Sequence, residues 1–198
     1  MSKKYSYFFI FSILVFFFLF VSSSYLNTSD NIHQQGFNTK YNVYSVLKPA
    51  DLKFANEKVP NISHDVWERL DKELLKNIYW QSNTMLYFKR ANKYFPIIED
   101  ILAKNNIPDD FKYLALIESG FEYTVSPSGA AGFWQIMRGT AREYGLEVNY
   151  AIDERYNLKK STEAACKYLK KAYQEFGSWT MAAAAYNMGI NGVRRNIK

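Results

Sequence analysis

The chain has 198 residues, of which 48% are hydrophobic and 18% aromatic, and it carries a net charge of +6. Once an N-terminal segment is set aside, this length suffices for one domain with a buried core. The single cysteine, Cys166, excludes an internal disulfide, and we expect it to be a small buried residue. No run of basic residues indicates nucleic acid, so the excess positive charge suits an anionic polymer or a membrane surface instead.

The first 24 residues have the form of an export signal. Lys3 and Lys4 precede an apolar run over residues 5–21, and three serines follow it. The run is long for a signal peptide and short for a membrane span, so cleavage after Ser24 and retention as a membrane anchor both stay open. With the two lysines on the cytoplasmic side, the rest of the chain faces outward. The expected location is therefore the periplasm or cell envelope, either free or attached to the membrane through residues 5–21.

Residues 25–58 are polar and lack hydrophobic periodicity, which predicts a tether. A helical pattern begins near Ser63. Its apolar residues recur at every fourth position, on one face of a helix: Val66, Leu70, Leu74 and Ile78.

We expect this first helix to continue towards Tyr94 and to break at Pro96, which then opens another helix through Leu102. Residues 59–96 are thus predicted to form an N-terminal helical extension. Residues 97–198 are predicted to form the main domain.

A helix carrying Glu118 is predicted between Pro108 and Gly120, because proline at the first position and glycine beyond the last turn are typical helix boundaries. Four apolar residues should make it mostly buried: Phe111, Leu114, Ala115 and Ile117. In the last turn, the helix dipole and apolar neighbours both disfavour a negative charge and raise the pKa of Glu118. A carboxylic acid that stays protonated suits general acid catalysis. An exposed carboxylate near a helix end is the alternative that the local pattern also allows.

Three further helices are predicted from capping and breaking residues. Their limits are, in order, Gly139-Thr140 to Gly145, Asn157 to Gly177, and Ser178 or Thr180 to Tyr186. Strand patterns are sparse, with at most a small β-hairpin between residues 125 and 136. The predicted fold class is therefore mainly α.

Four short elements carry a resemblance to a known family. They are Glu118-Ser119, SPSGA at 126–130, GFWQ at 132–135 and AYN at 185–187. In this order and spacing they resemble the family 1 lytic transglycosylases, which cut the glycan strands of bacterial peptidoglycan, and most of all the membrane-bound murein transglycosylase D type. The resemblance implies a lysozyme-like helical domain of the goose-type or SLT kind over residues 97–198.

The resemblance also implies the chemistry. Glu118 would protonate the oxygen of the β-1,4 bond between MurNAc and GlcNAc, and would then take a proton from the C6 hydroxyl of the muramic acid. That hydroxyl would close a 1,6-anhydro ring, so that no water is consumed. The partner would be the peptidoglycan glycan strand. No metal or cofactor is expected, and His33 and His64 are isolated in the sequence.

Six residues are implied to bind substrate: Ser119, Ser126, Gln135, Met137, Tyr186 and Asn187. The Tyr186 hydroxyl is further expected to hydrogen-bond Glu118 and orient it. Most of the 16 tyrosines lie outside the leader, which favours an aromatic-lined sugar cleft. Gly132 is expected to permit a close approach of the backbone rather than to bind a ligand.

Two other functions remain open. A lysozyme-like hydrolase would need a second carboxylate in the cleft, and the acidic residues nearest the motifs are Glu122, Asp153 and Glu154. A non-catalytic wall-binding protein is the other alternative, although Glu118, Gln135 and Tyr186 are all intact.

Two features depart from the family pattern. The spacing from Glu118 to Ser126 is one residue shorter than in many members, so we expect a reshaped loop. Relatives also normally continue well beyond the position of Gly189, so the domain is expected to be incomplete at its C-terminus.

Overall fold

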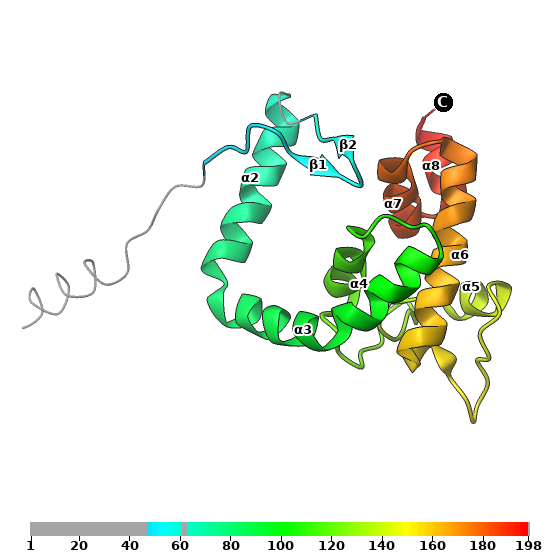
Figure 1. Cartoon of the computed structure of the whole chain (residues 1–198). Helices are drawn as coiled ribbons and strands as arrows, with labels where there is room; N and C mark the ends of the chain where they lie inside the picture. The colour runs from blue at the N-terminus through cyan, green and yellow to red at the C-terminus, as the bar shows by residue number, and fades with distance from the viewer. Residues whose placement is uncertain (1–46, 61–62, 198) are drawn as a thin grey trace, which may run out of the picture. The chain divides into compact units, whose positions relative to one another are not determined.

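The computed structural model describes residues 47–60 and 63–197. The predicted export segment and most of the predicted tether lie outside the described residues. The elements follow in the order β1 (Lys53–Phe54), β2 (Glu57–Lys58), α2 (His64–Tyr79), α3 (Gln81–Lys104), α4 (Phe111–Ser119), α5 (Arg138–Glu143), the 3₁₀ turn η1 (Glu154–Tyr156), α6 (Leu158–Phe176), α7 (Trp179–Met188) and α8 (Ile190–Asn196) (Figure 1).

The mainly α fold class is confirmed. Within the described ranges the only sheet is the antiparallel pair β1–β2, in which Lys53 lies opposite Lys58 and Phe54 opposite Glu57. The hairpin expected between residues 125 and 136 is reduced to single bridges that join Ala131 to Val125 and to Ile136. None of the helices in the described part of the chain combines the length and apolar character needed to cross a membrane.

The core gathers side chains from α3, α4, α6 and the GFWQ segment. Its largest fully buried members include Trp134, Phe111, Ile98, Leu102 and Leu169. The indole Nε1 of Trp134 donates a hydrogen bond to Thr162 Oγ1 on α6 (2.9 Å), so its one polar atom is satisfied inside the core. Cys166 is also fully buried, as predicted, and burial raises the pKa of its thiol to about 12.

The predicted break at Pro96 is wrong, because Pro96 lies inside α3 and the chain instead turns at Trp80, between α2 and α3. Proline removes one hydrogen bond, the one that would reach the carbonyl of Asn92. Both residues are exposed, so water can solvate that carbonyl. The next turns of α3 bury Ile98 and Leu102 in the core, which favours continuation of the helix. The predicted boundary between residues 96 and 97 therefore falls within one helix.

Helix α4 begins at Phe111, and the preceding Pro108 accepts a hydrogen bond from its N–H in a turn (3.1 Å). Its end is as predicted, with Gly120 at φ 58° and the Gly120 N–H bonded to Leu116 O (2.7 Å). The expected burial of Ile117 is wrong, since its side chain is 70% exposed. The buried stripe runs through residues 111, 114 and 115, and helical spacing places position 118 on that stripe and position 117 beside it.

The other helix ends depend on local capping. Asn157 Oδ1 accepts from Lys160 N (3.1 Å) at the start of α6, and Gly177 ends that helix at φ 67°, as predicted.

The starts of α7 and α5 differ in their caps. Ser178 rather than Thr180 caps α7, with its Oγ accepting from Met181 N (3.3 Å). Helix α5 begins after Met137 without a side-chain cap, so the expected cap at Thr140 is wrong.

The alanine run of α7 packs chiefly against α6 and α8, with Ala182 and Ala185 fully buried. Helix α8 was not predicted, because its seven residues are too few for a clear periodic pattern.

Residues 53–58, predicted as part of the tether, instead form a hairpin that packs on the main domain. Ala55 and Asn56 both have positive φ (51° and 65°), the conformation of a tight two-residue hairpin turn. The Ala55 N–H donates to Asp110 Oδ2 at the start of α4 (2.6 Å), and the rings of Phe54 and Phe111 meet edge to face with centroids 5.2 Å apart. Two-residue strands are too short to show alternation in the sequence.

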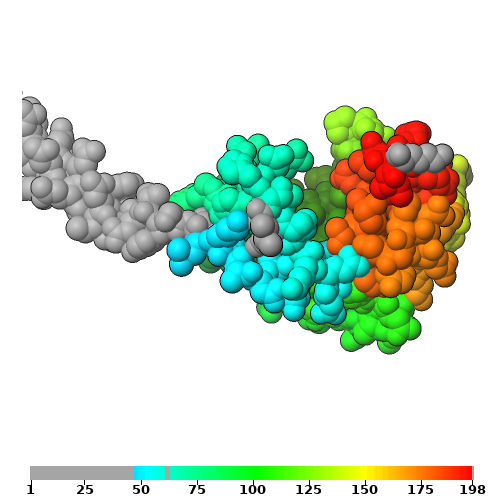
Figure 2. Space-filling model, turned by 90° about the horizontal axis from the view of Figure 1, so that it is seen from above, coloured from blue at the N-terminus to red at the C-terminus, as the bar shows by residue number. Residues whose placement is uncertain are grey.

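The hairpin also reaches α7 through Glu57. Its Oε1 accepts from Trp179 N (2.6 Å), and its Oε2 accepts from Thr180 N (2.9 Å) and Ser178 Oγ (2.8 Å). In Figure 2 the cyan atoms of the N-terminal segment touch the orange atoms of the C-terminal part. Desolvation raises the pKa of Glu57, but hydrogen bonds from Thr180, Ser178 and Trp179 outweigh it and lower this pKa to about 2.

The contact between Glu57 and α7 should make stability depend on pH. We expect Glu57→Gln to lower the free energy of unfolding by about 1 kcal/mol at neutral pH, as for other N-terminal caps. A carboxyl whose pKa is depressed stabilises the fold above its unfolded value of 4.5, and this stabilisation is lost as the pH falls towards 2. Urea denaturation of the wild type and variant at pH 7 and pH 3 should therefore show a difference that shrinks at pH 3.

The matched control is Glu68→Gln on the exposed side of α2. Its effect should be small at both pH values. If Glu57→Gln lowered the free energy of unfolding equally at pH 7 and pH 3, the ionised Glu57 carboxylate would not be the group that stabilises α7.

Candidate active site

Glu118 lies in the last turn of α4, on the helix stripe that faces the core. Its side chain is half-buried. Burial raises the pKa of its carboxyl, in the predicted direction. In the described part of the chain the carboxylate accepts no hydrogen bond and forms no ion pair, so no interaction opposes this shift. Such a group can hold a proton at a pH where an ordinary glutamate has lost it.

The Ser119 side chain is held by the protein backbone, and its role in substrate binding stays a prediction. Its side chain is buried, and its hydroxyl donates to Phe133 O (2.8 Å) while accepting from Phe121 N (3.0 Å). The hydroxyl therefore joins the end of α4 to the backbone of the GFWQ segment. This is a structural contact directly beside Glu118.

Ser126 has the geometry of a turn serine. Its Oγ accepts from Ala130 N (3.0 Å), and its own N–H and carbonyl take part in the same turn, bonded to Ala130 O (2.8 Å) and Gly129 N (2.9 Å). The side chain is half-buried and does not line the cavity described below. Its role in substrate binding stays a prediction.

Gly132 allows the GFWQ segment to lie directly on η1. At its φ of 77°, an added Cβ would lie 1.9 Å from the carbonyl oxygen of Arg155, which only glycine avoids. The expected close backbone approach is thereby confirmed. Arg155 is itself buried, and its Nη1 donates to Gly129 O (2.8 Å) and Ile136 O (3.0 Å), so one guanidinium binds the backbone on both sides of this segment.

Gln135 occupies the left-handed region at φ 45°, an uncommon conformation for a residue other than glycine. Its Nε2 donates to Thr124 O and to Gly132 O, both at 3.1 Å, which fixes the amide to the loop. The carbonyl oxygen of the amide is then the group that can accept from a ligand. Strained backbone of this kind is common at functional sites.

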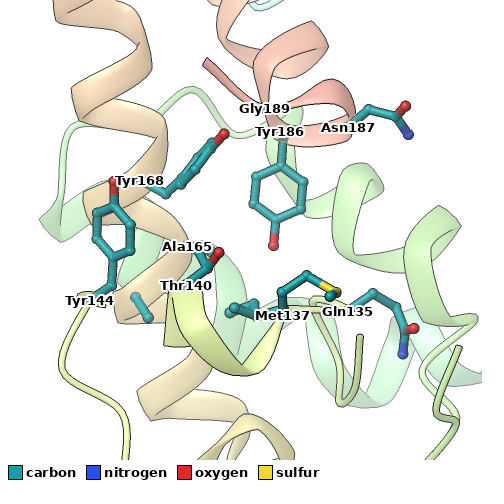
Figure 3. A pocket seen from close by; sticks show the side chains of 11 residues that line it. Gln135, Met137, Thr140, Tyr144, Ala165, Tyr168, Tyr186, Asn187 and Gly189 are labelled. Carbon is teal, nitrogen blue, oxygen red and sulfur yellow. The ribbon is translucent and has the colours of Figure 1, made fainter. Parts of the chain in front are cut away.

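Four of the six predicted substrate-binding residues line one cavity of about 190 Å³: Gln135, Met137, Tyr186 and Asn187. In Figure 3, Tyr186 descends from α7 into the cavity, with Tyr144 and Tyr168 on one side of it, Met137 below its hydroxyl and Gln135 beyond Met137. Glu118, Ser119 and Ser126 are not part of the cavity lining.

Tyr186 connects the cavity to Glu118. Its hydroxyl donates to Trp134 O (2.7 Å), so the expected hydrogen bond to the glutamate is replaced by one to the loop. Desolvation raises the pKa of the Tyr186 phenol well above its ordinary value, and the negative charge of nearby Glu118 raises it further. The tyrosine therefore stays protonated beside the glutamate and fixes the segment that carries Gln135.

Sequence reasoning missed the aromatic wall of the cavity. The rings of Tyr144 and Tyr168 lie 5.5 Å apart, and those of Tyr168 and Tyr186 lie 5.4 Å apart, both edge to face. The Tyr168 hydroxyl donates to Ala185 O (2.6 Å), which fixes its ring against α7. The number of tyrosines outside the leader was the available signal, but it did not single out these two.

The other acidic residues near the motifs are engaged in ion pairs. Glu122 pairs with Arg90 (2.6 Å), Asp153 with Arg155 (2.7 Å) and Glu154 with Lys160. Among the described residues, no three His, Cys, Asp or Glu side chains gather in a group that could hold a metal ion.

The close contact at Gly132 has a testable consequence for stability. We expect Gly132→Ala to lower the free energy of unfolding by about 2 to 4 kcal/mol, because the new methyl group meets the Arg155 carbonyl and the positive φ is unfavourable. Gly139→Ala is the matched control, since no atom lies within 4 Å of its added Cβ and alanine favours the helix it occupies. Thermal denaturation that gave the two variants the same midpoint would contradict this account.

Comparison with known proteins identifies the family. Residues 95–198 match the family described as the transglycosylase SLT domain. The chain is also similar to the membrane-bound lytic murein transglycosylase D of Escherichia coli strain K12 and of Escherichia coli O6:H1, with 34% identity over 133 residues in each case. The alignment covers 66% of this chain, which spans only 28% of the length of these relatives. The chain belongs to the transglycosylase SLT domain family.

Proposed function

We propose that this protein is a lytic transglycosylase that cleaves the β-1,4 bond between MurNAc and GlcNAc in peptidoglycan and leaves 1,6-anhydromuramic acid ends. One observation carries the proposal. Glu118 is a half-buried carboxyl with a raised pKa and, within the described residues, no hydrogen-bonding partner. Membership of the SLT family and similarity to relatives named as lytic murein transglycosylases support it.

Glu118 acts first as an acid and then as a base. The protonated carboxyl donates to the bridging oxygen, and the bond from that oxygen to C1 of the muramic acid breaks as positive charge develops on the sugar. The GlcNAc leaves with its new hydroxyl. The Glu118 carboxylate then takes the proton from the C6 hydroxyl, whose oxygen bonds to C1, so that the enzyme regains its proton.

The state of the other carboxylates supports transglycosylation over hydrolysis. A hydrolase needs a second carboxylate, to activate water or to act as nucleophile. Glu122, Asp153 and Glu154 are each held in an ion pair. In the lytic reaction the substrate supplies its own nucleophile, so one free carboxyl is sufficient.

The cavity that Tyr186 lines has the composition of a sugar site. Tyr144, Tyr168 and Tyr186 provide aromatic surface for the apolar faces of pyranose rings, and Met137, 44% exposed, adds a further apolar contact. Gln135 and Asn187 provide amide groups for the N-acetyl and hydroxyl groups of the sugars.

The cell envelope is the proposed place of action. The export pattern in residues 1–24 and the relatives named as membrane-bound support it. Attachment to the membrane through residues 5–21 belongs to the same proposal. Residues 59–198 are proposed to form the enzyme body, together with the hairpin of residues 53–58, which bonds to α4 and α7.

Analysis of digestion products tests the reaction. Purified sacculi treated with the full chain should release 1,6-anhydromuramyl products, identified by mass spectrometry. Glu118→Gln should lower their rate of release by about 10²- to 10⁴-fold, because general acid–base catalysis is lost. The matched control is Glu122→Gln, which removes a carboxylate that is already paired with Arg90 and should retain most of the activity. Products with reducing ends would contradict the proposed mechanism.

The pH dependence of kcat/KM tests the protonation state. The acid step requires protonated Glu118, and the pKa of this group lies above its ordinary value of 4.5. Activity should therefore persist above pH 4.5 and fall as the pH rises through the elevated pKa. A descending limb centred at or below pH 4.5 would show that Glu118 is not the essential acid.

A further inference from the structure

A second cavity, of about 480 Å³, adjoins the first one, which is lined by Gln135, Met137, Tyr186 and Asn187. The two share Thr140, Tyr144, Tyr168 and Gly189, and Figure 3 shows these four residues from the side of the first cavity. The remainder of the second cavity is formed by Glu143 on α5, Lys171 on α6, Met188 at the end of α7 and residues of α8. A ligand that fills the first cavity and extends past the Tyr144–Tyr168 wall would enter the second.

The second cavity is basic. Lys171, Arg194 and Arg195 line it, and Glu143 is the one acidic residue in its lining. Lys171 pairs with Glu143 (3.0 Å), and Arg194 pairs with Glu175 outside the lining (2.7 Å). Arg195 is exposed and forms no ion pair with any residue that the structure describes. A net positive charge therefore remains available to an anionic ligand.

The sugars of the proposed substrate do not account for this charge, because GlcNAc and the MurNAc ring are neutral. The anionic groups of a peptidoglycan strand are the free carboxylates of its peptide stems. Each stem begins on the lactyl group of a muramic acid, and a muramic acid carries the scissile bond. A stem therefore leaves the strand within a short distance of the reacting atoms, where a neighbouring cavity can receive it.

We propose that the second cavity binds the carboxylate-bearing peptide stem of the muramic acid being cleaved, with Arg195 as the main contact. This inference rests on the proposed function. Guanidinium groups bind carboxylates through two parallel hydrogen bonds, which gives directional recognition as well as attraction. The enzyme would then select strands that still carry charged stems.

Equilibrium binding tests the proposal without relying on turnover. Soluble strands are prepared in two forms, intact and with the stem carboxylates converted to amides, which removes charge with little change in size. The Glu118→Gln protein should bind intact strands about tenfold more tightly than amidated strands, as expected for a hydrogen bond to a charged group. Adding Arg195→Gln should remove this preference by weakening only the binding of intact strands. Lys159→Gln, an exposed position at the start of α6 outside the cavity lining, should leave the preference unchanged.

Two outcomes would overturn the proposal. Equal binding of both strand forms by the Glu118→Gln protein would show that carboxylates are not recognised. A loss in the Arg195→Gln protein that is equal for intact and amidated strands would show that Arg195 contacts a part of the strand other than the stem carboxylates. Failure of the transglycosylase reaction itself would appear separately, as the absence of anhydro products from wild-type digests of both strand forms.

Discussion

A short hairpin fixes the starts of the two helices that carry Glu118 and Tyr186, the main residues of the candidate site. Asp110, just before α4, accepts a hydrogen bond from the hairpin turn, and Glu57 of the hairpin accepts from the first N–H groups of α7. These two helices carry Glu118 and Tyr186 in their last turns. Because α4 has nine residues and α7 has ten, both span about 15 Å from the hairpin to the site. Fixing where the helices begin therefore helps to fix the positions of Glu118 and Tyr186 at their other ends.

Aromatic packing reinforces the same junction. Phe111 contacts Phe54 of the hairpin at 5.2 Å and Trp179 of α7 at 5.5 Å, both edge to face. Trp179 stacks in turn on Tyr173 of α6 at 4.1 Å. Three elements of the core and the hairpin thus share one cluster of rings, where charge-assisted hydrogen bonds and apolar burial act together.

Local features were predicted well from the sequence because their causes are local. Gly120 and Gly177 end their helices in the left-handed conformation, and Asn157 caps α6 through its own side chain. The motifs also indicate Gln135 and Tyr186, and both line the cavity. In each case the residue type and its immediate neighbours carry the information.

The predictions that failed concern features that depend on contacts between residues far apart in the sequence. Burial of the later turns of α3 keeps Pro96 inside a helix, and partners more than 50 positions away order the hairpin. Tyr144 and Tyr168 form a wall only because α5 and α6 come together. No pattern within a short stretch of the amino-acid sequence predicts these contacts.

The bonds of Glu57 also bear on how the molecule folds. They join positions separated by 121 to 123 residues, so they close a loop that contains nearly the whole described domain. Closing so long a loop costs entropy that only a largely ordered chain can offset, so such contacts form late and slow the search for the native state. The arrangement of Glu118 and Tyr186 would then be completed in the last stage of folding, when the hairpin of residues 53–58 meets α7.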